Sequence, residues 1–222
     1  MTDRTPKCLI AIQSVPLLSI WLSLCRRHGI DEVLINTHSH SDVLAAYVKE
    51  RTQTPKVLIA REEVLLGSAG TLVHNRTWVQ SEREFWILYG DVLTNVNLTR
   101  MLEFHRRNNQ IATIGVYRVS NASECGIATV DKYDVVREFV EKPKVPSGNL
   151  AFAGVMLATP AIFDLIVPEH IPADIGFHVL PKLVGRMAAY VISEYLVDIG
   201  TPISYQNAQR TWPGMDALVT GS

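Results

Sequence analysis

An α/β fold is the fold class that this sequence predicts, and three observations support it. Short runs rich in β-branched residues alternate with segments of helical period through the first half of the chain, a pattern typical of βαβ units and a largely parallel sheet. After residue 119, closely spaced strand-like runs with turn residues between them replace that pattern, so we expect antiparallel or mixed strands there. With 47% hydrophobic and 19% charged residues, the composition favours a globular core over intrinsic disorder.

The first half of the chain predicts three helices and four strands. Apolar residues at helical spacing from Leu17 to Cys25 indicate the first helix, which we expect to end with Gly29 in a left-handed conformation. A second helix is predicted over 41–51, and a third begins at Leu98. The predicted strands cover residues 32–37, 56–60, 85–89 and 111–119.

The second half predicts further strands and two helices. The predicted strands cover residues 126–130, 135–140, 150–157 and 189–195, and the predicted helices cover 177–186 and 202–212. We find no internal repeat, low-complexity tract or linker in the chain. A single domain over residues 1–222 is therefore the simplest interpretation.

Charge and cysteine content exclude several classes of partner. With 21 basic and 22 acidic residues the net charge is −1, so we expect neither nucleic acid nor an acidic membrane surface as a partner. The three cysteines, an odd number, lie at irregular spacings within apolar stretches. This pattern favours free thiols in a reducing cytoplasm over a disulfide framework or a zinc site. No apolar run reaches membrane-spanning length.

Two aspartates are the first candidates for chemistry. Asp91 follows the apolar strand 85–89 after one glycine, and Asp198 follows the predicted strand 189–195. Ligands of open α/β sheets bind at the carboxyl ends of strands, and a pair of carboxylates suits one Mg²⁺ that also contacts phosphate oxygens and water. The alternative, which position alone does not exclude, is that each aspartate caps a helix or a turn.

Residues 67–71 put small side chains at the mouth of a helix. There, backbone N–H groups could approach a nucleotide closely. The simpler alternative is a helix that begins with a glycine and uses Ser68 as its cap.

Glu141, Lys142 and Pro143 follow the strand that ends at residue 140. A lysine held beside a carboxylate could place a point charge on a phosphate, although an ordinary surface charge pair at a turn would also explain these residues. His38 and His40 resemble half of a metal site, but the sequence nearby lacks a third ligand, and we do not expect a metal there.

Taken together, several segments in this order resemble the sugar-1-phosphate nucleotidyltransferases. Each segment alone is a common string, and the order carries the resemblance. It implies a three-layer Rossmann-like nucleotide-diphospho-sugar transferase fold with a mainly parallel, mixed central sheet. The matching segments are Thr5-Pro6-Lys7 followed by Pro16-Leu17-Leu18, residues 28–38, Leu66 to Thr71, Gly90-Asp91, Glu141-Lys142-Pro143, Asn149 to Gly154, and Asp198 to Pro202.

The resemblance implies an enzyme that joins a nucleoside triphosphate to a sugar 1-phosphate, giving an NDP-sugar and pyrophosphate. Asp91 and Asp198 would hold Mg²⁺, and Lys7 would face the phosphates. Lys142 would neutralise the sugar phosphate, with Lys7, Lys142 and Asp91 as the catalytic residues. The implied substrate-binding residues are Gly67, Ser68, Ala69, Gly70 and Thr71 against the base, Glu141 and Asn149 at the sugar hydroxyls, and Gly126 and Gly154 beside the sugar ring.

The beginning of the chain departs from the family pattern. The family signature starts with a strand and a glycine-rich loop that carries an arginine, and only then reaches the Pro-Lys element. This chain begins just short of Pro6 and Lys7. We therefore expect the 1–222 domain to be N-terminally incomplete and poorly active in this form. Two smaller departures are Cys8, where a proline is usual, and Cys125, where an aromatic residue is frequent.

Two alternatives of other kinds remain open. The first is a catalytically inactive homologue that binds an NDP-sugar and serves as a regulatory subunit, although an inactive site has no reason to keep Asp91, Lys142 and Asp198. The second is a dinucleotide-binding oxidoreductase, but this sequence has no G-x-G-x-x-G motif after a first strand, as that class requires. Among nucleotides the resemblance favours GTP, with mannose- or heptose-type 1-phosphates as acceptors. A homo-oligomer is compatible with the sequence.

Overall fold

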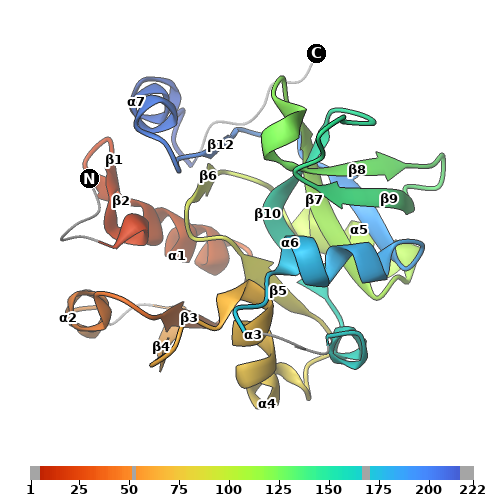
Figure 1. Ribbon diagram of the computed structural model, residues 1–222. Coiled ribbons are helices and arrows are strands. Elements are labelled where there is room, and N and C mark those ends of the chain that lie inside the picture. The colour runs from red at the N-terminus through yellow and green to blue at the C-terminus, as the bar shows by residue number, and fades with distance from the viewer. Residues whose placement is uncertain (1–5, 52–53, 167–170, 216–222) are drawn as a thin grey trace. The chain divides into compact units, whose positions relative to one another are not determined.

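The computed structural model describes residues 6–51, 54–166 and 171–215 (Figure 1). The chain divides into two compact units, each assembled from segments that are distant in the sequence. Unit 1 comprises Met1–Val64, Gly90–Asn97 and Glu194–Ser222, and unit 2 comprises Leu65–Tyr89 and Leu98–Ser193. Among the described residues, no helix is both long and apolar enough to cross a membrane.

In its described residues, unit 1 combines small sheets with three α-helices. β3 and β4 pair in parallel, whereas β1 with β2 and β6 with β12 pair antiparallel. Leu18, Leu22 and Leu44 form a buried cluster between α1, α2 and the β3–β4 pair. The elements are η1 (Lys7–Leu9), β1 (Ala11–Ile12), β2 (Val15–Pro16), α1 (Leu17–Arg27), β3 (Glu32–Thr37), α2 (Ser41–Lys49), β4 (Lys56–Arg61), β6 (Val92–Thr94), β12 (Leu196–Asp198) and α7 (Pro202–Thr211).

The end of α1 follows the sequence prediction. Gly29 has a φ of 71°, and its N–H donates to the carbonyl of Arg26, while the N–H of Ile30 donates to the carbonyl of Cys25. These two bonds form the Schellman arrangement that closes a helix with a left-handed residue. The glycine thus ends α1 and turns the chain toward β3.

Unit 2 is built on a six-stranded mixed sheet. Its order is β11-β7-β10-β8-β9, and β5 also pairs with β10. Helix α5 packs on β7 and β11 behind the sheet, and α6 packs on β9 in front of it (Figure 1). The elements are α3 (Gly67–His74), α4 (Arg76–Val79), β5 (Phe85–Leu88), α5 (Leu98–Asn108), β7 (Ala112–Arg118), η2 (Ala122–Glu124), β8 (Gly126–Val130), β9 (Val136–Glu141), β10 (Leu150–Ala158), η3 (Pro160–Asp164), α6 (Ile175–His178), η4 (Leu180–Leu183) and β11 (Met187–Val191).

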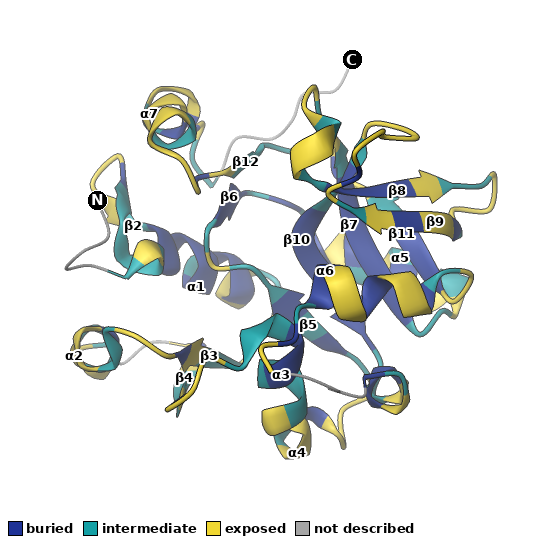
Figure 2. Ribbon diagram, viewed as in Figure 1, coloured by how far each residue is buried: buried dark blue, intermediate teal, exposed yellow. Residues whose placement is uncertain are grey.

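The unit 2 core lies on β7 and β10 at the centre of this sheet and on the adjoining edge strand β11. Figure 2 shows β7, β10 and β11 as almost continuously buried, and Ile114, Val116, Met156 and Met187 are each fully buried. A strand buried on both faces reads as a continuous apolar run rather than an alternating one. The run 150–157 has this character, which is why its strand could be predicted from the sequence.

The mixed character of the sheet is confirmed, but its parallel share is smaller than predicted. In unit 2, β11 and β7 pair in parallel, whereas β10 is antiparallel to β5, β7 and β8. The physical reason is that β8, β9 and β10 follow one another through short connections, and short connections join antiparallel strands.

The predicted helix over 177–186 is wrong in extent. The structure has the four-residue α6, followed by the separate 3₁₀ helix η4, with Val179 at the junction (φ −115°, ψ −56°). Pro181 explains the break, because its ring lacks an N–H and clashes with the carbonyl four residues earlier in a continuous helix. The predicted strand 189–195 is displaced to β11, and a separate short strand, β12, carries Asp198.

Candidate active site

The predicted phosphate and metal residues gather in unit 1. Lys7 opens η1, Asp91 directly precedes β6, and Asp198 is the last residue of β12. Because β12 pairs antiparallel with β6, Asp198 lies opposite Val92, and the N–H of Ile199 donates to the Asp91 carbonyl at 3.0 Å. The strand register therefore brings the two aspartates together. We call Lys7, Asp91 and Asp198 the unit 1 cluster.

Lys7 completes this cluster from the N-terminal side. Its Nζ lies 4.0 Å from Asp91 Oδ2, and its side chain is 53% exposed against 35% for Asp91. The next residue, Cys8, lies beside Gly90, because a Cβ on that glycine would be 3.8 Å from Cys8 Cβ. This spacing is ordinary van der Waals contact, so η1 packs against the strand end without requiring a glycine there.

The surroundings of Asp91 in the unit 1 cluster disfavour the ionised form of its carboxyl. Burial raises the pKa of Asp91, the negative charge of Asp198 raises it further, and the positive charge of Lys7 opposes both effects. Two carboxylates that repel each other gain stability when a cation is placed between them. The cluster therefore has an electrostatic reason to bind a positive ion.

These residues fit Mg²⁺ in the way that phosphate-transferring sites use it. Mg²⁺ is usually bound by one or two carboxylates, with phosphate oxygens and water completing its shell. Within the described residues, no group of three or more His, Cys, Asp and Glu side chains is placed to hold a metal ion. Substrate oxygens and water would therefore have to complete the metal shell. Asp91 and Asp198 would supply the carboxylates, and a bound substrate would supply the remaining oxygens.

The turn interpretation of Asp198 also has support. Its Oδ1 accepts a hydrogen bond from the Gly200 N–H at 2.6 Å. A Cβ on Gly200 would lie 2.8 Å from the same oxygen, so a larger residue there would displace the Asp198 carboxylate from this turn. One carboxylate oxygen of Asp198 thus stabilises the turn before α7.

A second set of predicted residues gathers in unit 2 around Glu141. Glu141 ends β9 and pairs directly with Gly126 of β8. The following residue, Lys142, has a φ of 49°, and its N–H donates to the Cys125 carbonyl at 3.0 Å. This bond holds the exposed lysine at the strand end. The cluster of Ser68, Gly126, Glu141, Lys142, Asp174 and Gly176 is called the unit 2 cluster below.

Two glycines enclose the Glu141 carboxylate. A Cβ added to Gly126 or to Gly176 would lie 2.4 Å from Glu141 Oε2 in each case. At Gly126 the same Cβ would also meet the ring of Phe139 at 2.6 Å. The space beside Gly126, which the family resemblance assigns to the sugar ring, is filled here by Glu141 and Phe139.

Burial and charge both act on Glu141. Burial raises the pKa of its carboxyl, and the negative charge of Asp174 raises it as well, whereas Lys142 lowers it. Glu141 is half-buried and Lys142 is exposed. Glu141 thus differs from an ordinary surface carboxylate at a turn.

The segment 67–71 begins α3 as predicted, but its amides have partners within the protein. The N–H groups of Ala69 and Gly70 donate to the carbonyl of Ala173, at 2.9 and 3.4 Å. Gly67 has a φ of 75°, and a Cβ on it would lie 2.3 Å from the same carbonyl oxygen. These amides are therefore used by the chain itself, so the idea that they face a nucleotide is not supported by this geometry.

Ser68 does not cap α3 in the structure. The residue at the N-cap position is Leu66, which makes no side-chain capping bond. Instead, Ser68 Oγ donates to Asp174 Oδ2 at 3.0 Å and accepts from the Ile175 N–H at 2.8 Å. The serine hydroxyl thus joins the start of α3 to the start of α6.

Asp174 is a functional candidate that sequence reasoning missed. It is the N-cap of α6, and its Oδ1 accepts from the N–H groups of Gly176 and Phe177. An aspartate directly before an apolar residue is a recognisable N-cap signal. Its position beside Glu141 depends on tertiary packing, and no local pattern encodes it.

Two further predicted residues have other partners. Asn149 Oδ1 accepts from Arg118 at 3.1 Å. Gly154 lies in the irregular stretch of β10 between Phe152 and Met156, has a φ of 67°, and its carbonyl accepts from the Tyr89 N–H at 2.8 Å. The left-handed backbone explains the glycine there by strand geometry alone.

His38 and His40 take structural places at the start of α2. His38 Nδ1 lies 3.0 Å from the carbonyl oxygen of Glu62. His40 occupies the N-cap position of α2 in a left-handed conformation, with a φ of 56°.

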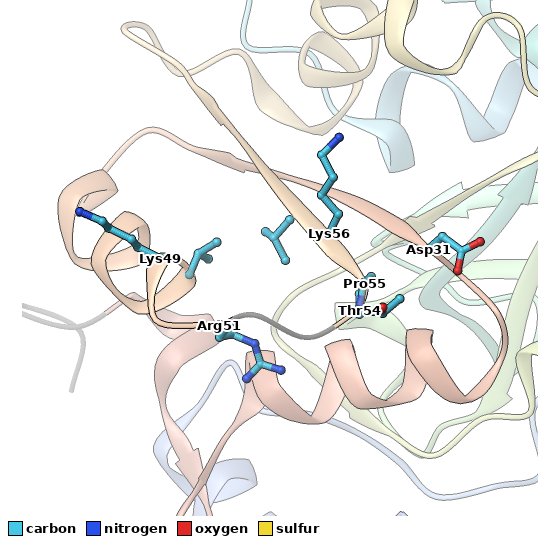
Figure 3. Close-up of a pocket in the computed structure, with 8 residues that line it drawn as sticks. Asp31, Lys49, Arg51, Thr54, Pro55 and Lys56 are labelled. Atoms are coloured by element: carbon cyan, nitrogen blue, oxygen red, sulfur yellow. The ribbon is translucent and has the colours of Figure 1, made fainter.

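Unit 1 also has an open pocket of about 540 Å³, which Figure 3 shows. Two of its basic side chains have partners within the protein: Lys56 pairs with Glu32 at 2.9 Å, and Arg51 lies over the ring of Tyr47 and donates to Ser19. Because the lining contains no residue of the unit 1 cluster, we do not assign the predicted chemistry to this pocket. The lining residues are Asp31, Val48, Lys49, Arg51, Thr54, Pro55, Lys56 and Val57.

The fold and the two clusters define an α/β protein of Rossmann-like type with acidic residues at its strand ends. Residues 1–213 match the family model described as nucleotidyl transferase. The chain belongs to the nucleotidyl transferase family, and the resemblance to the sugar-1-phosphate nucleotidyltransferases is confirmed.

Curated relatives support this assignment at the level of sequence. The chain is 29% identical to mannose-1-phosphate guanylyltransferase 1 of Arabidopsis thaliana, over 98% of this chain and 61% of the relative. It is 30% identical to the probable mannose-1-phosphate guanylyltransferase 3 of the same plant, over 93% of this chain and 64% of the relative. The chain thus spans less than two thirds of the length of these curated relatives.

Solved structures support the fold. HddC from Yersinia pseudotuberculosis has a TM-score of 0.80 at 19% identity, covering 96% of this chain and 92% of HddC. An apo UDP-glucose pyrophosphorylase has a TM-score of 0.81 at 17% identity, covering 95% and 91% of the two chains. The Rossmann-like α/β fold predicted from the sequence is therefore confirmed.

Proposed function

We propose that this protein transfers a nucleoside monophosphate from a nucleoside triphosphate to a sugar 1-phosphate, releasing pyrophosphate and an NDP-sugar. One observation carries the proposal: Asp91 and Asp198 act on each other electrostatically, with Lys7 beside them, in a chain of the nucleotidyl transferase family. The names of the relatives lend no support to the alternative of an inactive regulatory homologue.

The reaction needs positioning and charge neutralisation more than covalent catalysis. An oxygen of the sugar 1-phosphate attacks the α-phosphorus, and the bond from that phosphorus to the α,β-bridging oxygen breaks. Pyrophosphate leaves with the electron pair. Because the attacking phosphate oxygen is already anionic, no proton has to be removed from it, and the protein contributes by aligning the groups and stabilising negative charge.

The unit 1 cluster would serve the triphosphate. Asp91 and Asp198 would hold Mg²⁺, which when bound neutralises charge on phosphate oxygens. Lys7 would add a positive charge that does not depend on the metal. The 35% exposure of the Asp91 side chain leaves it accessible to a ligand.

The unit 2 cluster would serve the sugar 1-phosphate. Lys142, exposed at the end of β9, would neutralise the sugar phosphate, and Glu141 would accept hydrogen bonds from sugar hydroxyls. Asn149 would add a polar group at the sugar, and the segment 67–71 would lie against the base, without using the amides of Ala69 and Gly70, which donate to Ala173.

For substrate identity we propose GTP and a mannose-type 1-phosphate. The support comes from the curated relatives, which carry the name mannose-1-phosphate guanylyltransferase. We also propose a cytoplasmic location, because Cys8, Cys25 and Cys125 are free thiols and such thiols suit a reducing compartment.

The test is an activity panel on the purified 222-residue chain. Each of the four nucleoside triphosphates is combined with mannose, glucose and heptose 1-phosphates in the presence of Mg²⁺, and pyrophosphate release and NDP-sugar are both measured. We expect the highest rate with GTP and mannose 1-phosphate, and loss of the rate when EDTA is added. Because the sequence predicts low activity for residues 1–222, the panel is run at high protein concentration and with long incubation. Release of pyrophosphate without an NDP-sugar, or no product from any pair under these conditions, would contradict the proposal.

A further inference from the structure

Ser68 fastens the start of α3 to the segment before α6. The Ala69 N–H donates to the Ala173 carbonyl and the Ala173 N–H donates to the Leu66 carbonyl, both at 2.9 Å. The Ser68 hydroxyl adds a donated bond to Asp174 and an accepted bond from Ile175. Backbone and side chain therefore hold these two segments together at several points.

The Asp174 carboxylate is immobilised by this arrangement. Oδ1 accepts from the Gly176 N–H at 2.8 Å, which caps α6, and Oδ2 accepts from Ser68 at 3.0 Å. The Asp174 N–H donates to Nδ1 of His178 at 2.8 Å. Both oxygens and the backbone of Asp174 thus have partners that fix its direction.

Gly176 brings this fixed charge close to Glu141. A Cβ on Gly176 would lie 2.4 Å from Glu141 Oε2 and 3.2 Å from Asp174 Oδ1. Only a residue without a side chain lets the two carboxylates lie on either side of this position. The charged groups that act on Glu141 are Asp174 and Lys142, and the titratable ring in contact with Asp174 belongs to His178.

We propose that Ser68 and Asp174 are positioning residues for Glu141, which they hold ready to accept a hydrogen bond from a hydroxyl group of the sugar 1-phosphate. The inference rests on the proposed function, because that function supplies the sugar. Ser68 holds Asp174, and Asp174 with α6 limits the positions open to the Glu141 carboxylate. A carboxylate beside a like charge gains more from a hydrogen-bond donor than an isolated one, because the donor offsets the repulsion.

The arrangement also links two parts of the substrate site. Ser68 belongs to the segment 67–71 that we expect near the base, and Glu141 is expected at the sugar. A change at Ser68 should therefore affect the KM for the sugar 1-phosphate, even though the serine hydroxyl is bonded within the protein. A residue that contacted only the nucleotide would affect the KM for the triphosphate instead.

The central experiment uses Asp174→Asn. Asparagine keeps an oxygen that can cap α6 but removes the charge. We expect the KM for the sugar 1-phosphate to rise about tenfold, which corresponds to about 1.4 kcal/mol of lost binding, with a much smaller change in the KM for the triphosphate. The acidic limb of kcat/KM for the sugar 1-phosphate should move to lower pH, because Glu141 without its like-charged neighbour ionises more readily.

Two further variants separate positioning from general stability. Ser68→Ala should raise the same KM, Ser68→Thr should retain most of the wild-type value because it keeps the hydroxyl, and Ser68→Ala combined with Asp174→Asn should be little worse than Asp174→Asn alone. The matched control is Asp164→Asn, which removes an exposed carboxylate from unit 2. It should change neither KM nor the pH profile.

The outcomes distinguish the inference from the proposed function. An active wild type whose Asp174→Asn variant keeps both its KM and its acidic limb overturns the inference alone. A wild type that makes no NDP-sugar overturns the proposed function and the sugar role together. In that case, carboxyl NMR titration of Glu141 in the wild type and in Asp174→Asn still tests the electrostatic link, and identical titrations would remove it. If melting curves show that Asp174→Asn does not fold, Ser68→Ala decides the result.

Discussion

The unit 1 cluster and the unit 2 cluster have similar electrostatics, but their carboxylates differ in how exposed they are. In both, burial is the main cause of a raised carboxyl pKa, a second carboxylate adds to it, and a lysine opposes it. Asp91 of unit 1 keeps 35% of its side chain exposed, and its neighbour Asp198 is exposed. Glu141 of unit 2 is enclosed by two glycines and lies near an aspartate whose carboxylate already accepts three hydrogen bonds.

This difference indicates what each cluster can bind. An accessible pair of carboxylates can take up a cation and its further ligands, as Mg²⁺ with phosphate requires. A single carboxylate held in one place by packing suits a directional hydrogen bond to a hydroxyl group. The comparison therefore predicts a metal-dependent role for unit 1 and a sugar-recognition role for unit 2.

The largest expected effect is at Asp91. Asp91→Asn removes one of the two proposed metal-binding carboxylates and should lower kcat on the order of a thousandfold or more, since charge stabilisation is a major part of phosphoryl-transfer catalysis. The apparent affinity for Mg²⁺, from a metal titration of the rate, should fall in parallel. Asp164→Asn is the control. If Asp91→Asn has a normal rate and a normal metal dependence, the assignment of the metal site to unit 1 is wrong.

A smaller loss is expected at Lys142. Lys142→Ala should lower kcat/KM for the sugar 1-phosphate roughly a hundredfold, the size expected for one lost charge contact in a transition state. Its melting temperature should change little, because an exposed charge contributes little to stability.

Lys144 offers a matched control for this measurement. It is also exposed and lies two residues further along the chain, so Lys144→Ala should retain the wild-type rate. Equal activity of the two variants would return Lys142 to the role of a surface charge at a turn.

The smallest effect is a pH-dependent change in stability at Glu141. Its pKa is raised in the folded protein, so the ionised carboxyl destabilises the fold. The folded state is favoured at low pH, and that advantage is lost as the pH rises from the ordinary pKa of glutamate through the raised pKa. Glu141→Gln should therefore gain melting temperature relative to the wild type as the pH rises through this window, by a few degrees at most.

The control for this series is Glu103→Gln, an exposed position of α5. Its difference from the wild type should stay constant with pH. A constant difference for Glu141→Gln as well would contradict the effect of burial and of Asp174 on this carboxyl.

Local sequence signals were sufficient to predict most helices and strands and to single out the acidic residues that follow strands. The strands β3 and β8 lie where the runs 32–37 and 126–130 predict them, and α1 ends at Gly29. These signals are local, because β-branched runs and a left-handed glycine depend on neighbouring residues alone. Asp91 and Glu141 could be singled out for the same reason, since each follows a recognisable strand.

Tertiary structure decided which of these residues act on one another. The chain order does not place Asp174 beside Glu141, and it does not show that the amides of Ala69 and Gly70 donate to Ala173. The first depends on residues 33 positions apart in the sequence, and the second on segments about a hundred residues apart. Contacts of this kind leave no periodic pattern in either segment. The sequence by itself determined the strand ends and the residues that could carry chemistry, whereas packing determined their partners, their burial and therefore their pKa shifts.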